Sequence, residues 1–263
     1  MTFERTSHRA FLGVSALIVA LSATGTIAGC LSMSATAGML MPGGWKVSMM
    51  WIRMPGQTWA GATTSFVAMW IAMMVAMMLP SLVPVLLRYR QAVGSPVDAR
   101  MGRLTALVGI GYFFPWAGLG LAVFPMGVAL TAVALQLPAF ARAVPYAAGI
   151  VVLLAGALQF TAWKARHLAG WRQTLRSDGA LSADSRSAWR LGMRIGLRCT
   201  QCCAGSTAIL LVLGVMDLRV MAVVTAAVAT ERFIPSGERV AKALGVVAVG
   251  AGLFLIRRAV GTG

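Results

Sequence analysis

Long apolar stretches alternate with short polar segments along the whole chain. The apolar stretches cover residues 11–31, 62–87, 104–125, 146–163, 199–216, 218–233 and 241–256. Most come close to the roughly 20 apolar residues that an α-helix needs to cross a hydrocarbon core. The pattern predicts an all-α protein, a polytopic bundle of about seven transmembrane helices that forms a single membrane domain over 1–263.

The first apolar stretch has a second interpretation. Arg5 and Arg9 precede it and Ala35-Thr36-Ala37 follows it, as in a secretory signal peptide with its A-x-A cleavage site. The apolar run is long for a signal sequence, which favours an uncleaved helix. Cleavage would leave six helices with the same orientation.

Composition agrees with a membrane protein. Hydrophobic residues make up 59% of the chain and charged residues 11%, whereas a soluble domain carries about 25% charged residues. The net charge of +16 would suit a nucleic-acid-binding protein if the basic residues formed one surface. They fall between the apolar runs instead, so we expect no nucleic-acid partner, and the lipid bilayer is the surrounding medium.

The basic residues also predict an orientation. With the N-terminus in the cytoplasm, 17 of the 23 Lys and Arg residues lie on the cytoplasmic side, as the positive-inside rule requires. The chain is then a multi-pass protein of the cell inner membrane. Residues 32–61 form a Met-rich outer loop and residues 164–198 a basic cytoplasmic loop.

Methionines crowd the second apolar stretch and the outer loop. At 3.6 residues per turn, Met69, Met73 and Met77 share one helical stripe, which Met74 and Met78 widen. Thioethers are soft ligands suited to Cu(I), although flexible methionines also fill gaps between helices. A loop has no dry core to fill, so its methionines favour metal capture: Met33, Met39, Met41, Met49, Met50 and Met54.

Three cysteines begin the fifth apolar stretch. Cys199, Cys202 and Cys203 share one helical face, at what the pattern predicts to be the cytoplasmic entrance of the helix. We expect a metal or redox role, with the preceding arginines (Arg190, Arg194, Arg198) favouring the thiolate form by their positive charge. Cys30 stands alone, and its expected role is packing.

Two further polar residues are candidates. His167 follows the fourth stretch on the predicted side of the cysteines, so it is a candidate ligand, although an interfacial histidine is often only solvated. Glu231 lies within an apolar run, where a carboxylate is costly unless it is paired. Ion pairing is its expected role. The glycines at 192, 196, 205, 245 and 252 are expected to allow close helix packing.

These residues together resemble a bacterial family of predicted metal-binding integral membrane proteins, sometimes labelled copper chaperones. The resemblance runs through most of the chain: Met69-Trp70-x-x-Met73-Met74-x-x-Met77-Met78-x-Pro80, Gly111-Tyr112, Trp116, Gln159-x-Thr161-x-x-Lys164, Gly192-x-x-x-Gly196-x-x-Cys199-x-x-Cys202-Cys203, Gly214-x-Met216 and Glu231-Arg232. It implies that the Met and Cys residues are metal ligands. The family has cysteines where this chain has His167 and Gly170, and a Trp where it has Ala204, so the site is altered here.

The leading hypothesis is a non-enzymatic protein that binds or relays Cu(I) from the Met-rich loop and Met-lined helix to the cysteines. A soluble metal-handling protein or a second copy of the chain are candidate partners. One alternative is a membrane thiol-redox protein that uses Cys199, Cys202 and Cys203; another is a structural subunit in which these residues only pack. The chain has no Walker motif and too few histidines for haem, and no catalytic residues are expected.

Overall fold

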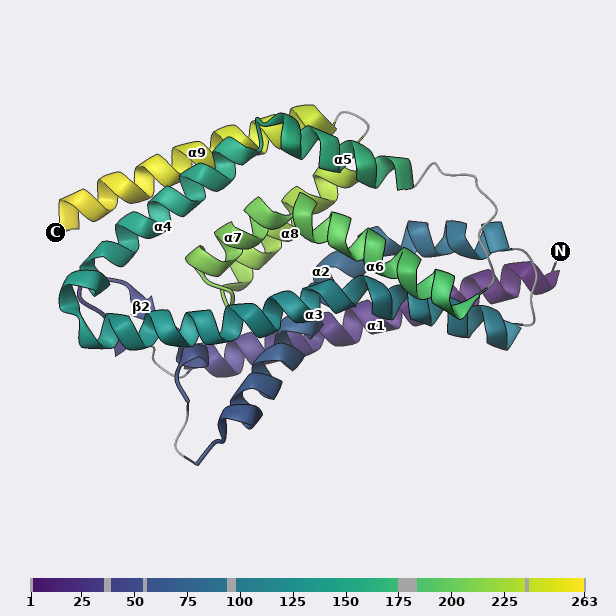
Figure 1. The fold of residues 1–263 in the computed structure, drawn as a ribbon, viewed down its shortest axis with the longest axis horizontal. Coiled ribbons are helices and arrows are strands. Elements are labelled where there is room, and N and C mark those ends of the chain that lie inside the picture. The colour runs from purple at the N-terminus through teal and green to yellow at the C-terminus, as the bar shows by residue number, and fades with distance from the viewer. Residues whose placement is uncertain are drawn as a thin grey trace.

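The computed structural model describes residues 2–35, 39–53, 56–93, 98–174, 184–234 and 237–262. Helices dominate this part of the chain (Figure 1). They are α1 (Thr2–Ala35), α2 (Trp59–Val93), α3 (Asp98–Gln136), α4 (Pro138–Leu158), α5 (Ala162–Thr174), α6 (Ser185–Cys202), α7 (Ala204–Leu213), α8 (Leu218–Phe233) and α9 (Gly237–Thr262). Between α1 and α2, strands β1 (Met39–Leu40) and β2 (Lys46–Val47) pair antiparallel and precede a short 3-10 helix, η1 (Met49–Trp51).

The predicted all-α, multi-span architecture is confirmed. Within the described ranges, five helices are long and apolar enough to cross a membrane: α1, α2, α3, α4 and α9. The pair α6–α7 meets the same criterion as one broken span with a bend of 60°. The predicted segment 218–233 is the helix α8, but its 16 residues fall short of the length of a full span.

Three layers of helices form the bundle (Figure 1). α2 packs against α1 and α3, and α4 packs along α9. The broken helix α6–α7 and α8 lie between these groups, because α6 contacts α3, α7 contacts α4 and α8 contacts α2. Large aromatic side chains join α2 to α3: the indole Nε1–H of Trp70 donates to the carbonyl oxygen of Trp116 at 2.9 Å.

Glycines allow α3 and α6 to pack with their backbones in contact. A Cβ on Gly192 or Gly196 would collide with the backbone of Val108 or Tyr112. On the other side of the bundle, a Cβ on Gly252 would lie 2.7 Å from the backbone nitrogen of Leu153 in α4. The packing role expected of these glycines is therefore confirmed, and close approach of helices through small residues is the usual way membrane helices associate.

Enlarging Gly196 tests this contact. We expect Gly196→Ala to lower the free energy of unfolding by about 1–3 kcal/mol, because the added methyl group overpacks the α3–α6 interface. Gly109→Ala is the matched control in α3, since a Cβ there has no neighbour within 4 Å and Ala is the better helix former. Thermal unfolding in detergent measures both; equal stability of the two variants would contradict the tight packing.

A tight turn joins α7 to α8. Gly214 has φ +129°, a conformation that side-chain-bearing residues rarely adopt. Asp217 then caps α8, accepting hydrogen bonds from the backbone N–H groups of Arg219 at 2.8 Å and Val220 at 3.3 Å. This turn sets the position of Met216, which faces the end of α1.

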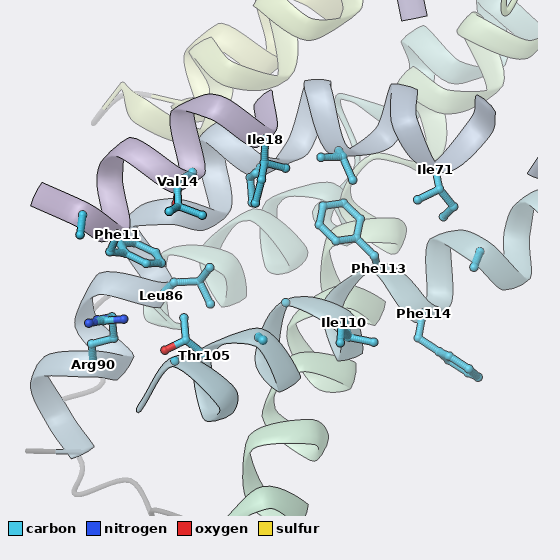
Figure 2. A pocket seen from close by; sticks show the side chains of 18 residues that line it. Phe11, Val14, Ile18, Ile71, Leu86, Arg90, Thr105, Ile110, Phe113 and Phe114 are labelled. Atoms are coloured by element: carbon cyan, nitrogen blue, oxygen red, sulfur yellow. The ribbon is translucent and has the colours of Figure 1, made fainter. Parts of the chain in front are cut away.

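A wide apolar groove of about 800 Å³ lies between α1, α2 and α3 (Figure 2). Phe11, Val14, Ile110 and Phe113 line it, and the guanidinium of Arg90 lies 5.0 Å from the centroid of the Phe11 ring at one end. The lining contains no sulfur, carboxylate or imidazole. The groove is therefore apolar and offers no soft or anionic ligand for a metal ion.

Candidate metal centre

The three clustered cysteines lie deep in the bundle, at the break between α6 and α7. The sequence pattern places them at the polar entrance of a helix, and this expectation is wrong, because α6 begins at Ser185. Cys199 lies about 21 Å along that helix at 1.5 Å per residue. Cys199, Cys202 and Cys203 are only 0%, 3% and 2% exposed. The basic first half of α6 is thus an amphipathic helix packed on α3, where the sequence suggested a loop.

The helix break brings two of the thiols to one place. The backbone N–H of Cys203 still donates to the carbonyl of Cys199 at 2.9 Å, so these residues are one turn apart on the same face. Cys203 lies between the end of α6 at Cys202 and the start of α7 at Ala204. The bend between the two helices therefore occurs at Cys203.

Arg232, from the last turn of α8, joins the two sulfurs. Its Nη2 donates to Cys199 Sγ at 2.8 Å and to Cys203 Sγ at 3.0 Å. Arg232 is 5% exposed, so this charge is held inside the bundle. The sequence pattern predicts that Arg190, Arg194 and Arg198 supply the positive charge near the thiols. That assignment is wrong, because these arginines are exposed on α6 and the guanidinium at the sulfurs comes from another helix.

Tyr112 completes one side of this arrangement. Its hydroxyl lies 2.9 Å from Cys199 Sγ, and the residue is fully buried. Tyr112 is in the part of α3 that packs on Gly196, so the close helix contact fixes the distance between the phenol and the thiol. A phenol can donate to a sulfur and so stabilise a negative charge on it.

A buried ion pair lies beside the cysteines. Lys164 Nζ, from α5, lies 2.7 Å from Glu231 Oε2 and donates to the carbonyl oxygen of Cys202 at 3.0 Å. The two side chains are 6% and 3% exposed. The expectation that Glu231 is ion-paired is confirmed. Because the pair links α5, α6 and α8, it holds Arg232, the next residue along α8, beside the break between α6 and α7.

The donor set suits a metal that accepts few ligands. Within the described residues, no three His, Cys, Asp or Glu side chains are grouped to hold one ion, so the four ligands of a structural zinc site are not provided. Cys199 and Cys203 offer two sulfurs within 3.0 Å of one nitrogen atom. A pair of thiolates matches Cu(I), a soft ion.

The methionines of α2 are part of the same core. Met73, Met74, Met77 and Met78 are between 1% and 6% exposed, and Met69 is half-buried. They belong to one apolar cluster with Cys199 and Cys203. Such burial suits packing as well as metal binding, so their role as ligands stays a prediction.

His167 lies on α5 against its own helix. Its Nδ1 is 2.8 Å from the carbonyl oxygen of Trp163, and its ring centroid is 4.2 Å from that of Trp163. These contacts orient the imidazole without connecting it to the cysteines. Its role as a metal ligand stays a prediction.

The Met-rich segment between α1 and α2 has a small core of its own. Met41 is 6% exposed and packs with Val47, Ala134 and Ala141. Met41 therefore fills a small core, and the expectation that methionine has no core to fill in this loop is wrong for this residue. Met50 is half-buried against the main cluster. Met54 and the side chains of Met33, Met39 and Met49 lie outside the described part of the structure.

A protein-family model matches residues 67–255, which is most of the chain. The description of that family is PpoB2, copper chaperone. The matched region includes the methionines of α2, the three clustered cysteines and all their buried polar neighbours. No curated protein and no solved structure matches the chain.

Proposed function

The chain belongs to the PpoB2 copper-chaperone family, and from this premise we propose that it carries Cu(I) between the thiolates of Cys199 and Cys203. One observation carries the proposal. A single nitrogen of Arg232 is hydrogen-bonded to both sulfurs, so the two thiols already face a common point. Copper is the cargo here, and the protein is a carrier rather than an enzyme.

Charge balance supports a monovalent ion at this pair. When Cu(I) replaces the two thiol protons, the ion and two thiolates together have a net charge of −1. The adjacent guanidinium of Arg232 then makes the buried group neutral, while Lys164 and Glu231 neutralise each other. A divalent ion and the same two thiolates would together be neutral and would leave the positive charge of Arg232 unbalanced, and a buried unbalanced charge is costly.

The other polar residues have supporting roles. Tyr112 donates its hydroxyl hydrogen to Cys199 once that sulfur is a thiolate. The pair of Lys164 and Glu231 positions α8 so that Arg232 reaches both sulfurs. Cys202 is next to the pair, and its sulfur is the nearest candidate for a third ligand during transfer.

We further propose a path for the cargo. Neutral thioethers bind Cu(I) less tightly than thiolates, so the methionines of α2 can pass the ion toward Cys199 and Cys203. The positive-inside bias of the sequence predicts that the Met-rich segment faces the outside. The path then runs from that segment toward the cytoplasm. A soluble metal-handling protein is the expected acceptor, because the chain has no sequence motif for ATP hydrolysis.

A copper titration tests the cysteine site. The purified protein, in detergent with a reductant, competes for Cu(I) against a coloured chelator. Cys199→Ser and Cys203→Ser are each expected to bind one Cu(I) ion fewer per chain than the unmodified protein. Met126→Leu, at an exposed methionine of α3, is the matched control, and Cys202→Ser, which removes a ligand proposed only for the transfer step, is expected to keep that ion at equilibrium.

The titration also separates the alternatives. Equal copper binding by the unmodified protein and by Cys199→Ser would contradict the proposed site. If thiol trapping then detected a cycling disulfide between Cys199 and Cys202 in protein without copper, the thiol-redox function would replace it. Full function of both serine variants would indicate that the cysteines only pack.

A further inference from the structure

A second group of sulfur atoms surrounds a small cavity that Cys199 does not line. Two α-helices, one turn and the short helix η1 contribute to it: Cys30 from α1, Met69 and Met73 from α2, Met216 from the α7–α8 turn, and Met50 from η1. The cavity has a free volume of about 10 Å³, which is about the space of one water-sized particle. Five sulfur-bearing side chains therefore line a space that can hold one ion.

Two of these sulfurs are already in contact. Cys30 Sγ lies 3.8 Å from Met216 Sδ, although 186 positions separate the residues in the sequence. Cys30 and Met73 are each 2% exposed, and Met50, Met69 and Met216 are half-buried. The cavity thus lies near the end of α1 and the start of α2, with part of its wall accessible and its deepest sulfurs enclosed.

The remaining lining defines what the cavity can bind. It consists of Thr26, Phe66, Trp70 and Val215, and no charged side chain is among the lining residues. A hydrated or doubly charged ion would be poorly stabilised in such a space. A monovalent soft cation bound to one thiolate is neutral overall, and thioethers and the faces of aromatic rings are suitable neighbours for it.

We propose that Cys30, Met216 and Met73 form a second Cu(I) site, with Met50 and Met69 completing it at the accessible side. On binding, the S–H bond of Cys30 breaks, a sulfur–copper bond forms, and the proton leaves to solvent. The oxidation state of copper does not change, so no electron donor or acceptor is needed. Cys30 and Met50 lie outside the matched family region, 67–255, so the family match does not assign this site.

The identity of the cargo rests on the proposed function, but the site itself stands on its own residues. Met73 belongs to both the cavity and the methionine row of α2. The site is therefore placed to receive Cu(I) before the ion moves along α2 to Cys199 and Cys203.

Copper stoichiometry and affinity test this site in the full-length protein in detergent, with Cu(I) supplied under anaerobic reducing conditions. Cys30→Ser is expected to bind one Cu(I) ion fewer than the unmodified protein, because a hydroxyl is a poor ligand for a soft ion. Met216→Leu keeps the side-chain volume and the fold. It is expected to weaken binding at this site by at least about tenfold, as loss of even an outer partner of a metal site does. Met126→Leu, at an exposed methionine of α3, is the matched control and leaves both quantities unchanged.

This experiment tests the two proposed copper sites independently of each other. If Cys30→Ser binds one Cu(I) ion fewer and Cys199→Ser also binds one ion fewer than the unmodified protein, both sites are supported. Loss in Cys30→Ser alone supports the new site and contradicts the proposed function at Cys199 and Cys203. Unchanged copper binding in both Cys30→Ser and Met216→Leu would overturn the inference and leave these sulfurs as packing residues.

Discussion

We expect Arg232→Met to weaken Cu(I) binding at the Cys199–Cys203 pair by about two to three orders of magnitude. The guanidinium donates to both sulfurs, and in the proposed site it is the positive charge that balances the two thiolates and the ion. Removing one partner of a buried charge pair costs about 3–5 kcal/mol, and each 1.4 kcal/mol is about a factor of ten in Kd. Methionine fills much of the same volume and leaves two neutral thiols, so the metal-free protein is expected to fold.

Competition titration of Cu(I) in the Cys30→Ser background measures this effect at a single site. Arg239→Met is the matched control, because Arg239 is exposed on α9. The Cu(I) affinity of this variant is expected to equal that of the background protein. Arg232→Lys keeps the positive charge but lacks the planar guanidinium group, so we expect an intermediate affinity for Cu(I). If Arg232→Met bound Cu(I) as tightly as the background, the charge-balance argument would be wrong.

Glu231→Gln is expected to lower the free energy of unfolding by about 3–5 kcal/mol, because it leaves the ammonium of Lys164 buried beside a neutral amide. The pair is 6% and 3% exposed, so water cannot take over the role of the carboxylate. Lys164 also donates to the carbonyl of Cys202. The loss is therefore expected to disturb the helix break at the cysteines as well as the global stability.

Thermal unfolding of a double variant in detergent checks this prediction. Apolar replacement of a buried ion pair is often close to neutral, so Lys164→Met combined with Glu231→Leu is expected to recover most of the stability. Glu238→Gln, at an exposed position of α9, serves as the control and changes stability by less than about 0.5 kcal/mol. A double variant as unstable as Glu231→Gln would show that the two residues do not act as a pair.

The pattern of apolar residues predicts the helices that face lipid on one side and the core on the other. It fails for α6, because the arginines at 186, 190, 194 and 198 lower the average hydrophobicity of that segment. Its apolar side nevertheless packs on α3 through Gly192 and Gly196. A search for periodic small residues within basic segments would have detected this helix, and with it the depth of the cysteines.

The candidate sites are less accessible to sequence reasoning because their partners are distant along the chain. Arg232 reaches Cys203 across 29 positions, Tyr112 reaches Cys199 across 87, and Cys30 reaches Met216 across 186. Residue types alone identified Cys199 and Cys203 as candidates and Glu231 as ion-paired. They could not show that Glu231 takes Lys164 as its partner, nor that the neighbouring Arg232 lies at the two sulfurs.

The binding of Cu(I) between Cys199 and Cys203 is tested most directly by X-ray absorption at the copper edge, on the Cys30→Ser protein loaded with one equivalent of Cu(I). We expect a copper ion with two sulfur neighbours and no nitrogen or oxygen neighbour, and loss of that signal in the further variant Cys203→Ser. Copper bound by nitrogen or oxygen, or a spectrum unchanged by Cys203→Ser, would contradict the account.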